Sequence, residues 1–264
     1  MSLQMDYKFI FVILFIGHLL GDFYFQSQLM VNKKDDDWKI MLCHGLIYMA
    51  AIVLPFLLLF TASLTEFYVI LLAPILHLIV DISKGWLNRN TLFEKRQGLI
   101  FALDQAIHII IILSVAYYYA IHTSVAYSWF GIQLGEIYAT LNLKLSLHQF
   151  IRFVCLFLFI GKPVNIIVSK ILDSVKEENV SDTNMEKTDS NTDPKAGWVI
   201  GILERYLTVI LILFDQYTAV GFAFTAKSVT RFDKISKDKV FAEQYLIGTM
   251  SSLLFAVIGA IMCM

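Results

Sequence analysis

The chain has 264 residues, of which 58% are hydrophobic and only 16% charged, and its mean hydropathy is +0.67. A soluble domain carries about 25% charged and about 45–50% apolar residues, so this composition excludes an ordinary soluble protein and indicates an integral membrane protein. The formal net charge of −1 provides no basic field for nucleic acid, and the three cysteines suggest no disulfide pair and form no CxxC motif.

Long apolar segments dominate the chain, and most approach the ~20 residues that a helix needs to cross the bilayer. The expected helices are 8–29, 40–61, 66–85, 98–121, 149–171, 198–213, 216–230 and 242–262. The sequence FDQY at 214–217 interrupts a stretch too long for one ordinary span, which favours a hairpin over a single long kinked helix. The predicted fold is an all-α polytopic transmembrane helical bundle with about eight membrane segments, including this C-terminal hairpin.

The distribution of Lys and Arg supports the hairpin and orients the chain. With the hairpin, the basic clusters that follow the first, third, fifth and seventh segments all lie on one side of the membrane. The positive-inside rule makes that side cytoplasmic. Trp38, Trp86 and Trp198 fall at the same boundary, as an aromatic belt predicts.

A polar stretch low in aromatic residues follows the fifth segment and is typical of a disordered linker. We therefore expect three parts: a five-helix membrane unit at 1–172, a disordered cytoplasmic linker at 173–196, and a three-helix membrane unit at 197–264.

Histidine and aspartate recur at helical spacing in the first four segments. HLLGDFYFQ, HLIVDISK and LDQAIH each place a histidine and an aspartate four residues apart, on one face of a helix, and CHG adds a single histidine. Because successive spans alternate in direction, all of these groups fall within roughly the last third of the membrane on the cytoplasmic side. The seven residues are His18, Asp22, His44, His77, Asp81, Asp104 and His108.

Inward-facing carboxylates and imidazoles are the usual ligands of metal sites in helical bundles. We predict that these seven side chains are metal ligands, with zinc as the expected metal and manganese or iron as alternatives. Seven groups exceed the needs of one tetrahedral ion. Either two ions bind, or one binds while the other groups surround it or act as acid and base, and Asp22, Asp81 and Asp104 are the candidate catalytic carboxylates.

Further polar residues are candidates for the layer around the metal or for substrate contact. In the N-terminal unit these are Gln26, Lys84 and Gln105; in the C-terminal unit they are Glu204, Arg205, Lys227, Arg231 and Glu243. The C-terminal group predicts either an intramembrane ion pair that locks helices together or a basic pocket for phosphate or lipid head groups.

These motifs, together with GILERY, AKSVTRF and EQYLIGT, resemble an uncharacterised bacterial family of multi-pass membrane proteins, domain of unknown function family 3307. That resemblance implies a membrane fold and no established activity. The His-plus-Asp pairs are more loosely similar to those of membrane-bound metal-dependent hydrolases, although the His-Arg-rich opening signature of those enzymes is not found.

The leading functional hypothesis is a metal-dependent hydrolase that acts at the cytoplasmic membrane face on a lipid-like or phosphate-containing substrate. A metal or proton transporter using the same groups, and a non-catalytic scaffold with a structural metal, remain alternatives. Membrane lipids are the expected partners, nucleic acid is not, and the sequence points to no protein partner.

Overall fold

The computed structural model describes residues 6–88, 97–123, 126–140, 146–180 and 194–263. The chain forms two compact units, Met1–Cys155 (unit 1) and Leu156–Met264 (unit 2). Each unit is described by itself.

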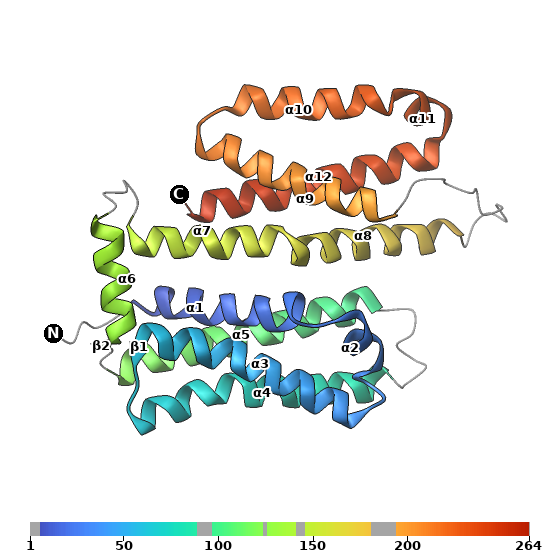
Figure 1. Ribbon diagram of the computed structural model, residues 1–264. Coiled ribbons are helices and arrows are strands. Elements are labelled where there is room, and N and C mark those ends of the chain that lie inside the picture. The colour runs from blue at the N-terminus through green and yellow to red at the C-terminus, as the bar shows by residue number, and fades with distance from the viewer. Residues whose placement is uncertain (1–5, 89–96, 124–125, 141–145, 181–193, 264) are drawn as a thin grey trace. The chain divides into compact units, whose positions relative to one another are not determined.

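Four long helices form a bundle in unit 1 (Figure 1). They are α1 (Tyr7–Leu19), α3 (Trp38–Leu59), α4 (Leu64–Asn88) and α5 (Gln97–His122). Helix α1 packs against α3 and α5, α3 also packs against α4, and α4 against α5, so the four helices enclose a common interior. The shorter α2 (Gln28–Lys33) and α6 (Trp129–Thr140) lie in the connections, and β1 (Phe60–Thr61) pairs antiparallel with β2 (Ala126–Tyr127).

Within the part of the chain that the structure describes, six segments are long and apolar enough to cross a membrane: Tyr7–Tyr24, Trp38–Leu59, Leu64–Trp86, Gly98–His122, Leu147–Val175 and Lys239–Cys263. The predicted all-α, polytopic helical bundle is therefore confirmed. The exposed leucines, isoleucines and phenylalanines along these helices form an apolar outer surface suited to lipid.

The interior of the unit 1 bundle is apolar in one half and polar in the other. The apolar half contains the N-terminal part of α1, the C-terminal part of α3, the N-terminal part of α4 and the C-terminal part of α5, with Ile10, Phe56, Ile70 and Ala116 at most 1% exposed. Among the described residues of unit 1, the fully buried polar and charged side chains all belong to the His/Asp cluster in the other half.

Helices α1 and α3 approach closely because two glycines face α3. A Cβ added at Gly17 would lie 2.6 Å from the Ala51 carbonyl oxygen, and one at Gly21 would lie 2.7 Å from the Tyr48 ring. A pair of glycines four residues apart is a common means of bringing membrane helices together. The residues beside these glycines, His18 and Asp22, are thereby carried to the α3 side chains.

The first segment ends earlier than the expected 8–29. A π-helical turn, η1 (Leu20–Tyr24), follows α1, and the Phe25 amide donates to the Leu20 carbonyl oxygen at 2.8 Å. The chain then leaves the helix before α2 begins, so Gln26 does not stack on the helix face of His18 and Asp22. Such single π turns are frequent at functional sites, because the extra residue reorients neighbouring side chains.

Unit 2 consists of helices α8 (Lys162–Val180), α9 (Pro194–Leu213), α10 (Tyr217–Thr230), α11 (Phe232–Lys237) and α12 (Lys239–Cys263). Helix α12 packs against α8 and α9, and α10 packs back on α9 (Figure 1). The predicted hairpin is confirmed, with its turn at Phe214–Gln216, where Asp215 has a φ of 56°. Neither α9 nor α10 is among the six candidate spans.

The boundary between the units falls inside α7 (Leu147–Ile160), which Gly161 separates from α8. Of the segment 173–196 predicted to be a disordered linker, residues 173–180 complete α8 and 194–196 begin α9, while 181–193 lie outside the described residues.

Candidate metal centre

The seven predicted ligand residues converge inside the bundle of unit 1. His18 and Asp22 come from α1 and η1, His44 from α3, His77 and Asp81 from α4, and Asp104 and His108 from α5. Each side chain is at most 8% exposed. Four histidines and three aspartates thus share one buried volume, which is costly for ionisable groups in a membrane protein unless they bind one another or a cation.

Four ligand atoms in this volume, two from histidines and two from aspartates, lie close to one another. His44 Nε2 lies 3.3 Å from His77 Nε2, 3.3 Å from Asp22 Oδ1 and 3.1 Å from Asp81 Oδ2. His77 Nε2 lies 3.2 Å from Asp22 Oδ1 and 3.7 Å from Asp81 Oδ2. Ligands about 2.0–2.1 Å from a tetrahedral zinc ion stand about 3.3–3.4 Å apart. Four of these five separations are close to that value, and the separation between His77 and Asp81 is longer. We call these four atoms the inner group.

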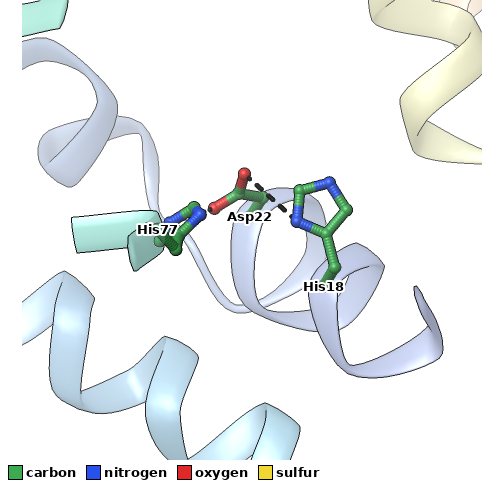
Figure 2. A group of neighbouring side chains, drawn as sticks. All are labelled: His18, Asp22 and His77. Carbon is green, nitrogen blue, oxygen red and sulfur yellow. Dashed lines mark ion pairs between the residues drawn. The ribbon is translucent and has the colours of Figure 1, made fainter. Parts of the chain in front are cut away.

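Asp22 Oδ1 is the member of the inner group that has no hydrogen bond. The atom is buried and lies 3.3 Å from His44 Nε2 and 3.2 Å from His77 Nε2, yet it has no hydrogen-bond partner. Figure 2 shows its carboxylate between the imidazoles of His18 and His77, which belong to different helices. A buried carboxylate oxygen that faces nitrogens without accepting a proton from them is in the position of a metal ligand.

A second group of ligands adjoins the inner group and shares Asp81. His108 Nε2 lies 3.7 Å from Asp81 Oδ1 and 3.3 Å from Asp104 Oδ1, and both His108 Nε2 and Asp104 Oδ1 are buried without a hydrogen-bond partner. Lys84 Nζ and the Gln105 amide both donate to Asp104 Oδ2, at 2.7 and 3.1 Å. The outer group therefore consists of Asp81 Oδ1, Asp104 Oδ1 and His108 Nε2, with Asp81 as the shared carboxylate.

One contact between imidazoles couples the two groups. His77 Nδ1 lies 3.2 Å from His108 Nδ1. If His77 binds a cation through Nε2, its Nδ1 carries the proton and donates to His108 Nδ1. A neutral His108 that accepts at Nδ1 carries its own proton on Nε2, which then has no lone pair for a metal. The outer group therefore binds a cation only after His108 gives up this hydrogen bond.

Lys34 supplies a positive charge to the cluster that the sequence analysis missed. Its Nζ donates to Asp81 Oδ2 at 2.8 Å. The Gln26 side-chain amide is oriented so that its oxygen accepts from Lys34 Nζ at 3.3 Å and its nitrogen donates to the Asp22 carbonyl oxygen at 2.8 Å. Burial lowers the pKa of the Lys34 ammonium, but the Asp81 and Asp22 carboxylates outweigh burial and hold this pKa above its usual value. Lys34 therefore stays charged at neutral pH.

Tyr48 is the second residue missed. Its ring stacks on His77 with a centroid distance of 3.5 Å and an interplanar angle of 2°, and its hydroxyl lies 3.1 Å from His18 Nδ1. Tyr48 follows His44 by one helical turn, so the i,i+4 rule that identified the aspartates would have placed it on the same face. Lys34 lies in a polar connection, where no local pattern marks it.

The residues proposed for the C-terminal unit lie in unit 2, around a separate cavity. Lys227 Nζ bonds Glu204 Oε2 at 2.6 Å, which is one of the ion pairs that the sequence allowed. Arg205 instead donates to the carbonyl oxygens of Ile160 and Gly161, among other acceptors, and Glu243 is exposed and does not line the cavity.

Fold and site together define a polytopic helical membrane protein with a buried His/Asp cluster suited to a metal ion. Residues 10–134 match the model of a family described as protein of unknown function (DUF3307), which confirms the resemblance expected from the motifs. The matched residues include all seven cluster residues, whereas the motifs GILERY, AKSVTRF and EQYLIGT lie outside them. Comparisons with curated proteins and with solved structures gave no match.

Proposed function

We propose that this protein holds a metal centre with one tight and one weaker site and uses it for metal-dependent hydrolysis. The inner group binds the first ion through His44, His77, Asp22 and Asp81. The outer group binds a second ion through Asp81, Asp104 and His108. Zinc is the expected metal because the inner spacing and the mixed nitrogen and oxygen ligands suit it, with manganese or iron as alternatives.

The observation that carries the proposal is the set of buried ligand atoms that lie close together without hydrogen bonds. Asp22 Oδ1, Asp104 Oδ1 and His108 Nε2 are all of this kind. Leaving such atoms unsatisfied costs about 1–3 kcal/mol each, and more where the group is charged. A cation at each group would remove this cost.

The two groups differ in the chemistry that they permit. Four protein ligands fill a tetrahedral ion at the inner group, which is the arrangement of a structural site. Three protein ligands at the outer group leave a fourth position for water, which is the arrangement of a catalytic site. A metal ion there would lower the pKa of the bound water and polarise an ester or phosphoryl oxygen.

Side chains of the chain itself complete this proposed site. Asp104 is held by Lys84 and Gln105, which fixes the direction of its carboxylate. Lys84, at 20% exposed, is the most accessible charged group at the outer group, and its ammonium is placed to attract an anionic substrate.

The substrate and the location are proposed from the depth of the cluster in the helices. The cluster lies toward the end of α1 and α4 and the beginning of α3 and α5, the end that the positive-inside rule assigns to the cytoplasm of a bacterial inner membrane. A lipid-like or phosphate-containing ester at that face is the substrate that can reach Lys84.

Transport by the same groups is the competing function, and the bundle interior argues against it. A transporter needs polar groups along a path through the membrane. The half of the unit 1 interior beyond the cluster is packed with apolar residues such as Ile13, Ile52 and Phe56.

The test uses the full-length protein purified in detergent and returned to liposomes. We expect bound zinc by elemental analysis, and metal-dependent hydrolysis of a phosphodiester or acyl ester presented in the lipid. Both should be lost on chelation and restored by metal. A paired assay measures flux of zinc across the same liposomes.

Three outcomes would contradict the proposal. If purified wild-type protein contains no metal above background, the proposed metal centre is wrong. Metal-dependent flux that Asp81→Ala abolishes makes the protein a transporter. If the protein binds metal but hydrolyses no ester, and chelation of the outer ion changes no measured property, the metal centre is structural.

A further inference from the structure

Unit 2 contains a cavity that the metal chemistry does not use. It has a volume of ≈ 330 Å³ and lies between α8, α9, α10 and α12. Cavities of about 300–1,000 Å³ are large enough for small ligands. Its walls contain three cationic side chains, Arg205, Lys227 and Arg231, and one carboxylate, Glu204.

Arg205 lines this cavity and is the most buried of its charged side chains, at 2% exposed. Pro163 lacks the N–H that would continue the helix, and α7 ends at Ile160. The Arg205 guanidinium donates to the carbonyl oxygens of Ile160 at 2.6 Å and Gly161 at 3.2 Å, and to Ser252 Oγ at 3.2 Å. These contacts fix the plane of the guanidinium.

Small and polar residues keep the space beside Arg205 open. Gly201 is one turn before Arg205, and a Cβ added there would lie 3.4 Å from Arg205 Nη1 and 3.2 Å from Asn165 Oδ1. Asn165 Oδ1 also accepts from Arg205 Nη2 at 3.0 Å. Ser252 lies near the middle of the candidate span Lys239–Cys263, so a charged group is held at a depth where charge is expensive and is by default functional.

The mouth of the cavity carries the other two cations. Lys227 and Arg231 are four residues apart, and Tyr245 lies under both, with its ring centroid 5.4 Å from Lys227 Nζ and 6.0 Å from the Arg231 guanidinium carbon. Glu204 holds Lys227 at 2.6 Å. Arg231 has only this ring contact among the described residues, so its guanidinium is available to a ligand.

We propose that this cavity binds the phosphate of an anionic ligand, with Arg231 and Lys227 at its mouth and Arg205 at its base. Arginine and lysine beside hydroxyl and amide groups are the usual partners of phosphate oxygens. The same chemistry serves an anionic lipid head group and a soluble phosphate compound. The site belongs to unit 2 and is independent of the proposed hydrolysis.

The experiment measures how the full-length protein binds two sources of phosphate, a lipid head group and inorganic phosphate. In the first arm, protein in detergent is mixed with phosphatidylglycerol or phosphatidylcholine, and retained lipid is measured by native mass spectrometry. In the second arm, inorganic phosphate or chloride is added at equal ionic strength, and the melting temperature is measured. The arm that shows specific binding identifies the source.

Three variants with stated directions test the residues. Arg231→Gln should lower the apparent affinity about fivefold, as expected for the loss of one basic contact. Glu204→Gln should raise it, because Lys227 is released and a repelling carboxylate is removed. Lys237→Gln, on the exposed face of α11, is the matched control and should leave affinity unchanged.

Opposite shifts in Arg231→Gln and Glu204→Gln are the result that supports the proposal, and neither substitution disturbs the buried Arg205. Equal binding by wild type, Arg231→Gln and Lys237→Gln in both arms overturns it. A loss in Lys237→Gln as large as that in Arg231→Gln also overturns it, since it would indicate general surface charge.

Discussion

Asp81 is the residue on which both ligand groups depend, because its two carboxylate oxygens face different histidines. Oδ2 lies 3.1 Å from His44 Nε2, and Oδ1 lies 3.7 Å from His108 Nε2. Asp104, in contrast, faces only the outer group. Substituting each aspartate in turn therefore tests whether the cluster binds two ions that share Asp81 or one ion only.

We expect Asp81→Asn to lose both ions and Asp104→Asn to lose only the weaker one. Loss of a direct ligand should lower the metal affinity by more than the roughly 10–100-fold that follows from mutating residues that hold the ligands in place. Zinc titration of the purified variants, followed by elemental analysis, measures both stoichiometry and affinity. Asp36→Asn, on an exposed residue, is the control. Equal metal content in Asp104→Asn and wild type would exclude a second ion.

Lys34 competes with a metal for Asp81, since its ammonium and the cation need the same carboxylate oxygen. Lys34→Met should tighten zinc binding by at least about tenfold, because two unit charges about 4 Å apart repel by several kcal/mol even at moderate dielectric. The same change should lower the melting temperature of the metal-free protein, because it leaves Asp81 without its cation. Isothermal titration and thermal melts measure these two effects.

Lys33→Met is the matched control for Lys34→Met, because Lys33 is exposed. Weaker zinc binding in Lys34→Met would show that the ammonium organises the site and does not compete with the metal.

The sequence predicted the cluster at the residue scale because periodicity is a local property. Histidines and aspartates four apart on apolar segments predict a shared face, and all seven meet in the structure. Lys34 and the Nδ1 contact between His77 and His108 could not be predicted, because they depend on how a polar connection folds back and on the rotation of two rings.

At the scale of the elements, the close approach of α1 and α3 sets the geometry of the inner group. The glycines at positions 17 and 21 permit this approach, and a side chain at Gly17 would meet the α3 backbone at Ala51 and Ile52. Backbone atoms cannot move aside as a flexible side chain can, so the helices would have to separate.

Gly17→Ala should therefore destabilise the protein by about 1–3 kcal/mol, as overpacking does, and lower its metal affinity. Gly135→Ala is the matched control: it lies in α6 with nothing within 4 Å of an added Cβ, so it should be neutral or slightly stabilising. Thermal melts and zinc titration of both variants check this. A Gly17→Ala variant that melts and binds zinc like wild type would show that α1 and α3 need not approach so closely.

The helices were predictable where length and composition decide them, and not where a single residue does. The hairpin at 214–217 follows from a polar turn inside a stretch too long for one span, and the structure confirms it. The first helix ends before the expected residue 29, because the π turn at Leu20–Tyr24 follows it. This turn could not be predicted, since one inserted residue leaves no signal in hydropathy.

At the scale of the whole molecule, polar and apolar residues separate along the four helices of unit 1. An apolar core fills one half, and seven ionisable groups are buried in the other beside a few apolar residues such as Leu19 and Met41. The stability of the polar half therefore depends on how the charges of these groups are balanced. Lys34 and Lys84 supply two positive charges against three aspartates, which leaves one negative charge in the cluster when the four histidines are neutral and favours a bound cation.

Metal removal should for this reason loosen one part of the protein selectively. An ion bound to the folded state alone stabilises it by RT ln(1 + [L]/Kd), about 2.7 kcal/mol at a hundredfold excess over Kd. Hydrogen exchange with mass spectrometry on chelator-treated and zinc-loaded protein measures where this stabilisation acts. We expect slower exchange on zinc binding at the ends of α1 and α4 and the beginnings of α3 and α5, where the ligands lie. The apolar half of the same helices is the internal control, because it contributes no ligand and should change much less. Protection spread evenly along all four helices, or confined to the helices of unit 2, would mean that zinc acts elsewhere than at the His/Asp cluster.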